Sequence, residues 1–557
     1  MTEVIQDPQP LDAADPFARE AQTFPKLSGE MSRRIAAYGQ EEAPPAGTLL
    51  FARGQRRVDF FLILDGHVEI LEHDRNGVAH TILLLRSHQF TGELHLYNER
   101  QSLLSARAGP NTRVVRVSRE KFQRLVANEP DIGEVIMRAF ILRRVGSLLH
   151  AYGGVELVGP ARYGETLRIR RFLERNAYPY RLLDTELSQD GARFVEEFGV
   201  SPRDLPVVLM PGKVVLRSPG NAELADALGL VEALVPDRIY DLAVVGAGPA
   251  GLAAAVYAAS EGLSTVVLES TAPGGQAAAS SKIENYLGFP TGISGQALAG
   301  RAQNQAQKFG ARLAVTRTVT GLDCVANPYR LTINGEEVVR ARSIVVASGA
   351  RYRRPDLVDC ERFEGRGIHY AATAMEAQIC VGQDIAVVGG GNSAGQAALF
   401  LARSATHVHI LLRGSSLEDG MSDYLVQRIA SSPNISVLPF TKITGVAGDR
   451  YLNQVSWTNR RSGITETHVI ANLFLMIGAE PNTEWLAGCL RLDPKGFVHT
   501  GTDERGEPLT SPFATSQPGI FAVGDVRSGS VKRVASAVGE GSVVVQAIHH
   551  FLHPVIN

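Results

Sequence analysis

Two glycine-rich segments of this chain have the residue types and the spacing that bind the phosphates of a dinucleotide. The first, residues 246–251 with the sequence GAGPAG, follows the apolar run 240–245 and precedes the alanine-rich segment 252–259. Glycines allow a tight turn between a strand and a helix, and they let a pyrophosphate approach the free N–H groups at the start of that helix. We therefore predict a dinucleotide site that includes Gly246, Gly248, Pro249, Ala250 and Gly251.

An acidic residue completes this first unit. Residues 265–268 predict the next strand, and Glu269 ends it, 18 residues beyond Gly251. A carboxylate in this place accepts hydrogen bonds from the ribose hydroxyls of the dinucleotide. Strand, glycine turn, helix and acid together are far more specific than the glycines alone.

A second unit repeats the arrangement. The apolar residues 384–388 lead into residues 389–394, GGGNSA, and the following strand 407–412 ends in Arg413 and the residues Gly-Ser-Ser instead of an acid. An acid would repel the 2′-phosphate of NADPH, whereas an arginine beside hydroxyl groups accommodates it. NADPH is therefore the predicted ligand, with NADH less favoured, and an ordinary exposed loop arginine is the alternative for Arg413. The residues expected to bind NADPH are Gly389, Gly391, Asn392, Ser393, Ala394 and Arg413.

Length, charge and hydropathy set limits on the rest. The 557 residues suffice for three or four domains. A formal net charge of −2 offers no electrostatic footprint for nucleic acid or for an anionic membrane, so we expect small molecules or another protein as partners. Residues 1–16 lack the basic start and apolar core of a secretion signal, and no apolar run approaches the roughly 18 residues of a membrane span. We expect a cytoplasmic protein.

The cysteines are too scattered to suggest a disulfide framework. Cys324, Cys360, Cys380 and Cys489 lie far apart in the sequence and form no C-x-x-C motif. We predict that all four are buried free thiols, and we expect neither a zinc site nor another metal site.

The N-terminal region has the pattern of a small antiparallel barrel or sandwich. Apolar runs at 49–51, 59–64, 68–71, 81–85 and 114–117 are separated by glycines, and residues 135–149 have helical apolar spacing. The segments FPKLS at 24–28, F-x-x-G at 51–54, FFLIL-x-G at 60–66 and GEL at 92–94 occur in the order typical of one known fold. The region resembles the cyclic nucleotide-binding domain of the catabolite activator family.

In that family a Gly-Glu-Leu segment holds the ribose and a downstream arginine pairs with the cyclic phosphate. The resemblance implies the first role for Glu93, but it places the arginine at Ser102. Arg100 and Arg107 could reach the phosphate only from out of register. Because a buried phosphate needs a cationic partner, we favour a degenerate sensor kept as a docking or dimerisation module, with a cyclic nucleotide effector as the alternative.

The middle region follows a β-α-β order. Helices are expected at 167–173, 193–198 and 222–228, and extended segments at 180–183, 204–209 and 214–216. This region resembles the thioredoxin or glutaredoxin fold, with Pro206 where that family has a cis-proline. The family's C-x-x-C would lie at 160–166, PARYGET, which has no cysteine. Dithiol exchange needs a thiolate, so the resemblance implies a scaffold alone.

Further motifs beyond the first glycine turn point to a flavoprotein. Residues 274–276 (GGQ), 283–286 (IENY), 346–350 (VASGA) and 519–525 (GIFAVGD) occur in the order of the thioredoxin reductase family, which the chain resembles from about residue 238 to its end. The resemblance implies that Asp525 holds the ribityl chain of FAD and that Gln276 and Asn285 lie along the cofactor. It also gives the isoalloxazine contact to Lys532, Arg533 and Val534, and it adds Gly275, Gly349 and Gly524 to the FAD site.

The redox-active cysteines of that family are missing. Its members have Cys-Ala-Thr-Cys after a tyrosine, followed by an aspartate that acts as general acid, whereas this chain has YAATAM at 370–375, with Ala371 and Ala374 in place of the cysteines. His369 and Glu376 are candidates for a proton donor. A surface or helix-capping role is the favoured interpretation for both, and Cys380 is better explained as a core residue than as a new nucleophile.

These observations predict a multidomain fold. A tail at 1–20 precedes a β-barrel cyclic nucleotide-binding-like domain at 21–150 and an α/β thioredoxin-like domain without C-x-x-C at 151–235. Two Rossmann-like α/β domains follow: an FAD domain in two parts, 238–353 and 478–557, with an NADPH domain inserted at 354–477. By resemblance the chain forms a homodimer.

The leading hypothesis for function is an NAD(P)H-dependent FAD oxidoreductase. Hydride would pass from NADPH to FAD and on to a redox protein, a small oxidant or dioxygen. The first alternative is a nucleotide or redox sensor or scaffold without turnover. The second is reduction of a thioredoxin disulfide by a non-standard route.

Overall fold

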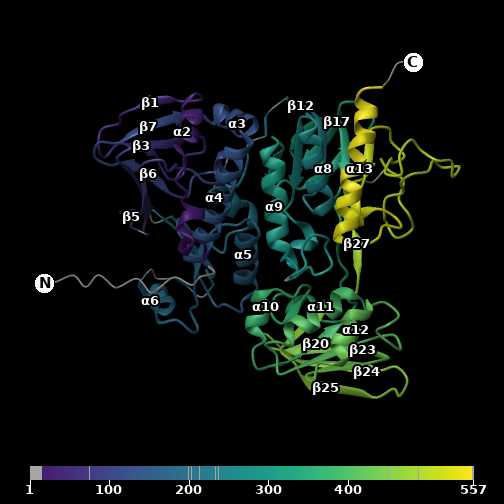
Figure 1. Cartoon of the computed structure of the whole chain (residues 1–557). Coiled ribbons are helices and arrows are strands. Elements are labelled where there is room, and N and C mark those ends of the chain that lie inside the picture. The colour runs from purple at the N-terminus through teal and green to yellow at the C-terminus, as the bar shows by residue number, and fades with distance from the viewer. Residues whose placement is uncertain are drawn as a thin grey trace. The chain divides into compact units, whose positions relative to one another are not determined.

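The computed structural model describes residues 15–554 except 75, 99, 198–199, 202, 212–213, 233, 236, 281, 450 and 487. The chain folds into two compact units (Figure 1). Unit 1 comprises Met1–Pro160 and Asn176–Glu232, and unit 2 comprises Ala161–Arg175 and Ala233–Asn557. Most of the expected N-terminal tail, residues 1–14, lies outside the described residues, and so does Phe198 at the end of the helix expected at 193–198.

The first part of unit 1 consists of two antiparallel sheets, with strand orders β1-β7-β3 and β2-β6-β4-β5. Stacked phenylalanine rings fill its core, and the Phe60 and Phe122 ring centroids are 5.1 Å apart. The five strands predicted from apolar runs are present, whereas the polar strand β1 and the strand β6 were missed. The elements are β1 (Gln40–Glu42), β2 (Leu49–Phe51), β3 (Phe60–Asp65), β4 (His67–His73), β5 (Ala79–Arg86), β6 (Ser105–Ala108), β7 (Arg113–Val117), α1 (Glu20–Thr23), α2 (Gly29–Ala36), α3 (Arg119–Asn128) and α4 (Pro130–His150).

The second part of unit 1 is a four-stranded sheet with the order β11-β10-β8-β9. β8 and β9 are parallel, and β10 is antiparallel to β8 and forms the predicted hairpin with β11. The Leu205–Pro206 peptide bond before β10 is cis. The elements are β8 (Val155–Val158), β9 (Tyr180–Leu183), β10 (Val207–Met210), β11 (Val214–Arg217), α6 (Gln189–Glu197) and α7 (Asn221–Ala227). Between β8 and β9 the chain forms helix α5 (Gly164–Arg175), which belongs to unit 2.

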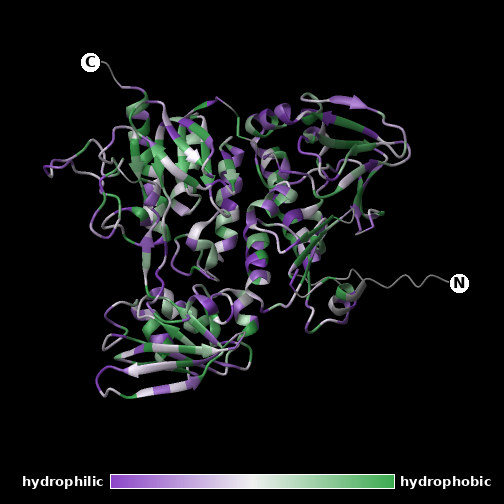
Figure 2. Cartoon of the chain, turned by 180° about the vertical axis from the view of Figure 1, so that it is seen from behind, coloured by the Kyte–Doolittle hydropathy of each residue, from purple (hydrophilic) through white to green (hydrophobic). Residues whose placement is uncertain are grey.

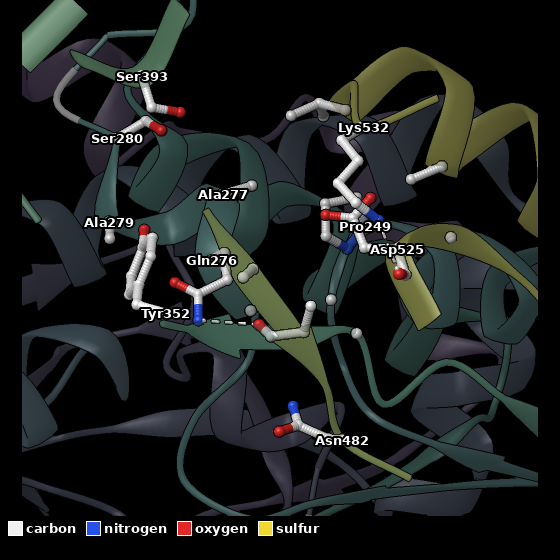
Figure 3. Close-up of a pocket in the computed structure, with 18 of the residues that line it drawn as sticks. Pro249, Gln276, Ala277, Ala279, Ser280, Tyr352, Ser393, Asn482, Asp525 and Lys532 are labelled. Carbon is white, nitrogen blue, oxygen red and sulfur yellow. Dashed lines mark hydrogen bonds between the residues drawn. The ribbon is translucent and has the colours of Figure 1, made fainter. Parts of the chain in front are cut away.

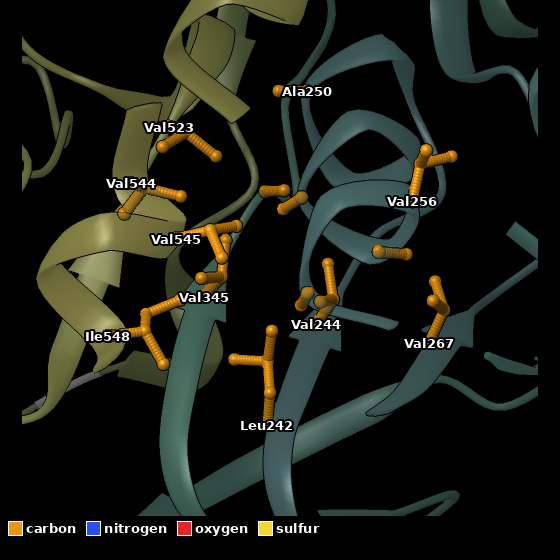
Figure 4. Close-up of a cluster of buried hydrophobic side chains, with 14 of the residues drawn as sticks. Leu242, Val244, Ala250, Val256, Val267, Val345, Val523, Val544, Val545 and Ile548 are labelled. Carbon is orange, nitrogen blue, oxygen red and sulfur yellow. The ribbon is translucent and has the colours of Figure 1, made fainter. Parts of the chain in front are cut away.

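The larger sheet of unit 2 has the order β14-β13-β12-β17-β16-β15, with β28 paired to β17. β12, β13, β14, β17 and β28 are mutually parallel, as expected for a dinucleotide fold. Leu242, Val244 and Val345 on one face of this sheet pack against α8 and α13 (Figure 4). The elements are β12 (Ile239–Val245), β13 (Thr265–Glu269), β14 (Arg312–Val315), β15 (Val319–Asp323), β16 (Tyr329–Ile333), β17 (Glu337–Val346), β28 (Ile520–Ala522), α8 (Pro249–Ser260), α9 (Gly295–Lys308) and α13 (Val534–Leu552).

A second sheet, with the order β19-β26-β20-β21-β22, is fully parallel. In the sequence its strands lie between β17 and β28 of the larger sheet. Its central strands are buried and mostly hydrophobic in colour in Figure 2. A three-stranded sheet, β23-β24-β25, accompanies it, and the pair β18-β27 lies where the chain enters and leaves the insertion. The elements are β18 (Ala350–Tyr352), β19 (Ile368–His369), β20 (Asp384–Val388), β21 (His407–Leu411), β22 (Ile435–Leu438), β23 (Thr441–Gly448), β24 (Leu452–Asn459), β25 (Thr465–Val469), β26 (Asn472–Leu475), β27 (Ala479–Pro481), α10 (Ala374–Ile379), α11 (Asn392–Leu401) and α12 (Asp423–Ala430).

The prediction of four free thiols was wrong for two of them. Cys324 and Cys489 form a disulfide with a Cα–Cα distance of 6.1 Å, while Cys360 and Cys380 are buried free thiols. The two half-cystines are 165 residues apart because they lie in the two parts of one discontinuous domain. Sequence spacing alone carries no sign of such a pair.

No described helix is long and apolar enough to cross a membrane. No group of three or more histidine, cysteine, aspartate or glutamate side chains in the described ranges is arranged to hold a metal ion.

Candidate functional site

One cavity in unit 2, of about 1580 Å³, is lined by both glycine-rich turns (Figure 3). Gly251 is the one predicted dinucleotide residue that does not line it. A Cβ atom on Gly251 would overlap with the carbonyl oxygen of Gly246, so this glycine allows α8 to pack closely on the turn. The predicted residues that line the cavity are Gly246, Gly248, Pro249, Ala250, Glu269, Gly275, Gln276, Asn285, Gly349, Gly389, Gly391, Asn392, Ser393, Ala394, Arg413, Gly524, Asp525, Lys532, Arg533 and Val534.

The first turn presents the N-terminus of α8 to the cavity. Gly246 has a φ of 103°, and a Cβ atom there would overlap with the carbonyl oxygen of Ala347, so glycine is required for the turn itself. Gly248 is the N-cap residue and no side chain caps the helix. A Cβ atom on Gly248 would meet only the Cα atom of Gly275, 3.9 Å away, so the space before the helix is open. An anion can reach the free N–H groups of this twelve-residue helix.

Glu269 is held rigidly at the end of β13. Its Oε2 accepts a hydrogen bond from the N–H of Ala247 at 2.8 Å, and its Oε1 accepts from the N–H groups of Thr271 at 3.0 Å and Ala272 at 3.3 Å. These backbone donors fix the carboxylate beside the first turn. The Ser270 hydroxyl also donates to Oε1, at 3.5 Å. Among the described residues Oε2 accepts only from Ala247, so this oxygen can still accept from a ribose hydroxyl.

Residues from the C-terminal part close the cavity on another side. Asp525 lies in a 3-10 turn (Gly524–Val526), and Glu540 of α13 fixes this turn by accepting from the N–H of Gly524 at 2.6 Å. Burial raises the pKa of the Asp525 carboxyl. Lys532 donates from Nζ to the carbonyl oxygen of Asp525 at 3.0 Å, and Gln276 donates from Nε2 to that of Ala350 at 3.2 Å (Figure 3).

The second turn has the same construction at the start of α11. Gly391 is the N-cap residue, no side chain caps the helix, and a Cβ atom there would meet only the carbonyl oxygen of Gly420 at 3.8 Å. Asn392 accepts from the N–H of Ser422 at 2.7 Å. Arg413 is exposed and lines the cavity, and an acid lies close to its loop, since Ser415 donates to Asp419 at 3.4 Å.

The segment that replaces the redox motif lies outside the residues that line this cavity. The N–H of Thr373 donates to Oε2 of Glu376 at 2.8 Å, which makes Glu376 a capping residue of α10. The Glu376 carboxylate is fully buried and forms an ion pair with Arg171 at 2.5 Å. The surface or capping role expected for His369 was wrong, because this residue is buried in β19 with its Nε2 3.0 Å from Oδ1 of Asn472. Burial lowers its pKa to about 4.

Cys380 offers no reactive replacement for the missing thiols. Its side chain is fully buried, and burial raises the thiol pKa to about 12. At neutral pH the thiolate, which is the nucleophilic form, is therefore nearly absent.

The site expected in the first part of unit 1 is occupied by the chain's own groups. Glu93 is largely covered, with 13% of its side chain exposed, and forms an ion pair with Arg144 of α4. Ser102 is buried and donates to the carbonyl oxygen of Leu104 at 2.8 Å. The expectation that Arg100 or Arg107 could reach a phosphate is not met, because Arg100 donates to the carbonyl oxygen of Asn176 at 2.9 Å and Arg107 forms an ion pair with Glu69 at 2.5 Å.

Several cavity residues were missed by the sequence motifs. Arg175 comes from α5, a helix outside both dinucleotide folds in the sequence, and no motif marks it. The aromatic residues Tyr352 and Trp485 and the polar residues Arg317 and Asn482 also line the cavity. They follow the glycine motifs at distances that vary with loop length, so spacing does not single them out.

Comparison with known proteins identifies the family. The model of the pyridine nucleotide-disulphide oxidoreductase family matches residues 240–541. The chain belongs to this family. The cyclic nucleotide-binding domain model matches residues 42–129. These matches confirm the predicted fusion of a cyclic nucleotide-binding domain with thioredoxin reductase-like α/β domains, and the enzyme class, an NAD(P)H-dependent flavoprotein oxidoreductase.

Several of the similar proteins are thioredoxin reductases. The chain is 33% identical over 360 residues to NADPH-dependent thioredoxin reductase 3 of Arabidopsis thaliana, covering 61% of this chain and 65% of that protein. It is 31% identical over 304 residues to the thioredoxin reductase of Streptomyces coelicolor, covering 54% of this chain and 91% of the relative. A crystal structure of Lactococcus lactis thioredoxin reductase aligns with a TM-score of 0.52 and 29% identity, covering 56% of this chain and 99% of that chain.

The family implies FAD and NAD(P)H as cofactors, and the cavity fits two dinucleotides. Two helix N-termini without side-chain caps open into it, and the glycine before each leaves the approach clear. Glu269 and Asp525 supply carboxylate acceptors for hydroxyl groups. The fit therefore rests on the shape and donor groups of this chain as well as on its family.

Proposed function

We propose that this chain is an NADPH-dependent FAD oxidoreductase that passes electrons to an acceptor without using a dithiol of its own. The main support is that both glycine turns line the same cavity. In addition, the chain has Ala371 and Ala374 at the positions where the resemblance places the redox cysteines. When bound, FAD would take a hydride from NADPH and release the electrons to the acceptor.

The residues have separate tasks in this proposal. Gly246, Gly248 and the start of α8 bind the FAD diphosphate, while Glu269 accepts from its ribose and Asp525 from its ribityl hydroxyls. Lys532, Arg533 and Val534 would lie along the isoalloxazine ring. Gly389, Gly391 and the start of α11 bind the diphosphate of the nicotinamide cofactor.

The preference for NADPH over NADH is supported by Arg413. Its guanidinium group is exposed at the cavity and has no carboxylate within ion-pair distance among the described residues. It can therefore pair with a 2′-phosphate. Asp419 near the same loop weakens this preference without removing it.

The acceptor is proposed to be a redox protein, a quinone-like oxidant or dioxygen. Dithiol exchange is disfavoured because the described free thiols, Cys360 and Cys380, are both buried, and the Cys324–Cys489 disulfide is not among the residues that line the cavity. A cytoplasmic homodimer is the expected form, and the ion pair between Glu93 and Arg144 favours a structural role for the N-terminal domain over cyclic nucleotide sensing.

Steady-state oxidation of NADPH by the purified holoprotein tests this function. We expect turnover with a quinone, dioxygen or a low-potential redox protein, and no sustained reduction of thioredoxin. Tight binding of NADPH without turnover with any acceptor would support the sensor alternative instead. Sustained thioredoxin reduction would show that dithiol chemistry proceeds without the missing cysteines.

A further inference from the structure

Helix α5 is attached to unit 2 along its whole length. Near its middle Arg171 pairs with Glu376 of the inserted domain, and near its end the carbonyl oxygen of Glu174 accepts from Nε2 of Gln296 of α9 at 2.7 Å. Just before the first turn of α5, the guanidinium carbon of Arg366 lies over the ring of Tyr163, 5.3 Å from the ring centroid. The helix thus contacts both dinucleotide folds of unit 2.

The last residue of α5, Arg175, lines the cavity. Its Nη2 donates to the carbonyl oxygens of Ala272 at 3.1 Å and Gly275 at 3.2 Å. Both carbonyls belong to the loop after Glu269, and this loop touches the first glycine turn, since a Cβ atom on Gly275 would lie 2.9 Å from the Cα atom of Gly248. The guanidinium group is therefore beside the first dinucleotide site and not the second.

The charge of Arg175 is only partly balanced. Glu269 is near enough to act on it electrostatically, but among the described residues no carboxylate forms an ion pair with its guanidinium group. Its Nε is buried without a hydrogen-bond partner. Burial lowers the pKa of the group. A buried cation that is satisfied only by carbonyl oxygens keeps an unmet preference for an anion.

The other cations that line the cavity differ in this respect. Lys532, Arg533 and Arg413 are exposed to solvent, and Arg317 has Glu337 at 3.6 Å. Arg175 alone among these described cations combines a buried Nε that lacks a hydrogen-bond partner with the absence of a carboxylate within ion-pair distance.

We propose that Arg175 is a positioning residue for FAD, supplying from α5 the positive charge that holds the diphosphate in the cavity. The assignment rests on the proposed function, which puts FAD in this part of the cavity. A bound diphosphate completes the hydrogen bonding of the buried guanidinium group and fixes the loop 272–275 between α5 and the first turn. FAD binding therefore strengthens the attachment of α5 to unit 2, because a ligand that contacts only the attached form stabilises it.

The test is the affinity of the FAD-free protein for FAD and for riboflavin, measured by quenching of flavin fluorescence. We expect Arg175→Met to weaken FAD binding about 10- to 100-fold, as for loss of a charge-assisted hydrogen bond. Riboflavin has no diphosphate, so its affinity should change less than threefold. Arg175→Lys should recover most of the FAD affinity, and Arg168→Met, on the same helix but paired with Glu165, should match the unaltered protein.

Two other results would overturn the assignment. Equal loss of FAD and riboflavin affinity in Arg175→Met would mean that Arg175 only braces the loop, and an FAD affinity within twofold of the unaltered protein would mean that it has no role. Salt provides a second measure if Arg175→Met folds poorly, since raising the ionic strength should weaken FAD binding more in the unaltered protein than in Arg175→Gln. If the unaltered protein binds no FAD at all, the proposed function itself fails, and that failure is distinct from both.

Discussion

The carboxylate of Glu376 and the guanidinium group of Arg171 form an ion pair in which the acid is completely buried while the arginine is about one-third exposed. The pair connects α5 to α10, the helix that begins at Ala374. Glu376 also caps α10 through the N–H of Thr373. An acid that is bound by both groups is poorly placed to give a proton to a substrate, and it is well placed to hold α5.

Removing the arginine of this pair should destabilise unit 2. Burial raises the pKa of Glu376, but the charge of Arg171 and the Thr373 hydrogen bonds overcome this effect and hold the pKa below its usual range. Arg171→Met leaves a buried carboxylate without its cation, which costs about 1–3 kcal/mol after allowance for the exposure of the arginine. The thermal midpoint followed by flavin fluorescence should fall, while Arg168→Met should leave it unchanged. An equal midpoint in Arg171→Met would show that the pair contributes nothing.

The burial of His369 should make the folded protein less stable in mild acid. Its pKa is lowered from 6.5 to about 4 because the neutral ring is buried. Between these two pH values the ring is protonated in the unfolded chain but neutral in the folded chain. The free energy of unfolding therefore rises with pH, and it falls as the pH drops from about 6.5 to about 4. The loss should reach about 3 kcal/mol at the lower limit. The difference between unfolding midpoints at pH 7 and pH 5 should be smaller in His369→Gln, and an identical difference would contradict the assignment.

Gly391 should be required for binding NADPH and not for folding. A Cβ atom there would meet only an oxygen 3.8 Å away, so the protein tolerates alanine, but the methyl group would stand before the N-terminus of α11. Gly391→Ala should raise the dissociation constant for NADPH about tenfold or more, as for partial loss of charge-assisted hydrogen bonds, with unchanged FAD content. Gly300→Ala on α9, where a Cβ atom meets nothing within 4 Å, is the matched control. Unchanged NADPH affinity in Gly391→Ala would place the cofactor elsewhere.

Arg413 should select NADPH over NADH. Arg413→Met removes the cation offered to the 2′-phosphate and should weaken NADPH binding about tenfold or more, with little effect on NADH. The comparison is made by titrating both nucleotides into the unaltered protein, Arg413→Met and Arg403→Met, an exposed arginine outside the cavity lining. Loss of affinity for both nucleotides to the same extent would mean that Arg413 does not contact the 2′ position.

Cys380 should be chemically inert in the native protein. Its buried thiol, with a pKa raised to about 12, should resist alkylation at pH 8 until the chain is unfolded. Cys380→Ala should reduce its flavin with NADPH at the unaltered rate. Slower reduction in this variant, or rapid alkylation of the native thiol, would reopen the possibility that it replaces the missing cysteines.

The sequence predicted the local patterns well and the long-range pairings poorly. The two glycine turns, their strands and the capping acid Glu376 are short-range features, and the structure contains each of them. Nothing in the spacing of Cys324 and Cys489 indicated a disulfide, because they meet only after the insertion brings the two parts of one domain together. Arg175 was missed for the same reason, since its place in the cavity depends on where a helix between two strands of unit 1 packs. The partner of Glu93 was missed as well, because Arg144 lies 51 residues later on a helix.

Anaerobic titration of the FAD-loaded protein with NADPH tests the central claim most directly. The flavin absorbance near 450 nm should bleach completely after about one equivalent of NADPH per FAD, because each hydride carries two electrons and the Cys324–Cys489 disulfide lies outside the cavity lining. A requirement for two equivalents would reveal a second two-electron centre and contradict the claim that this chain works without a dithiol. Absence of bleaching would contradict the oxidoreductase function itself.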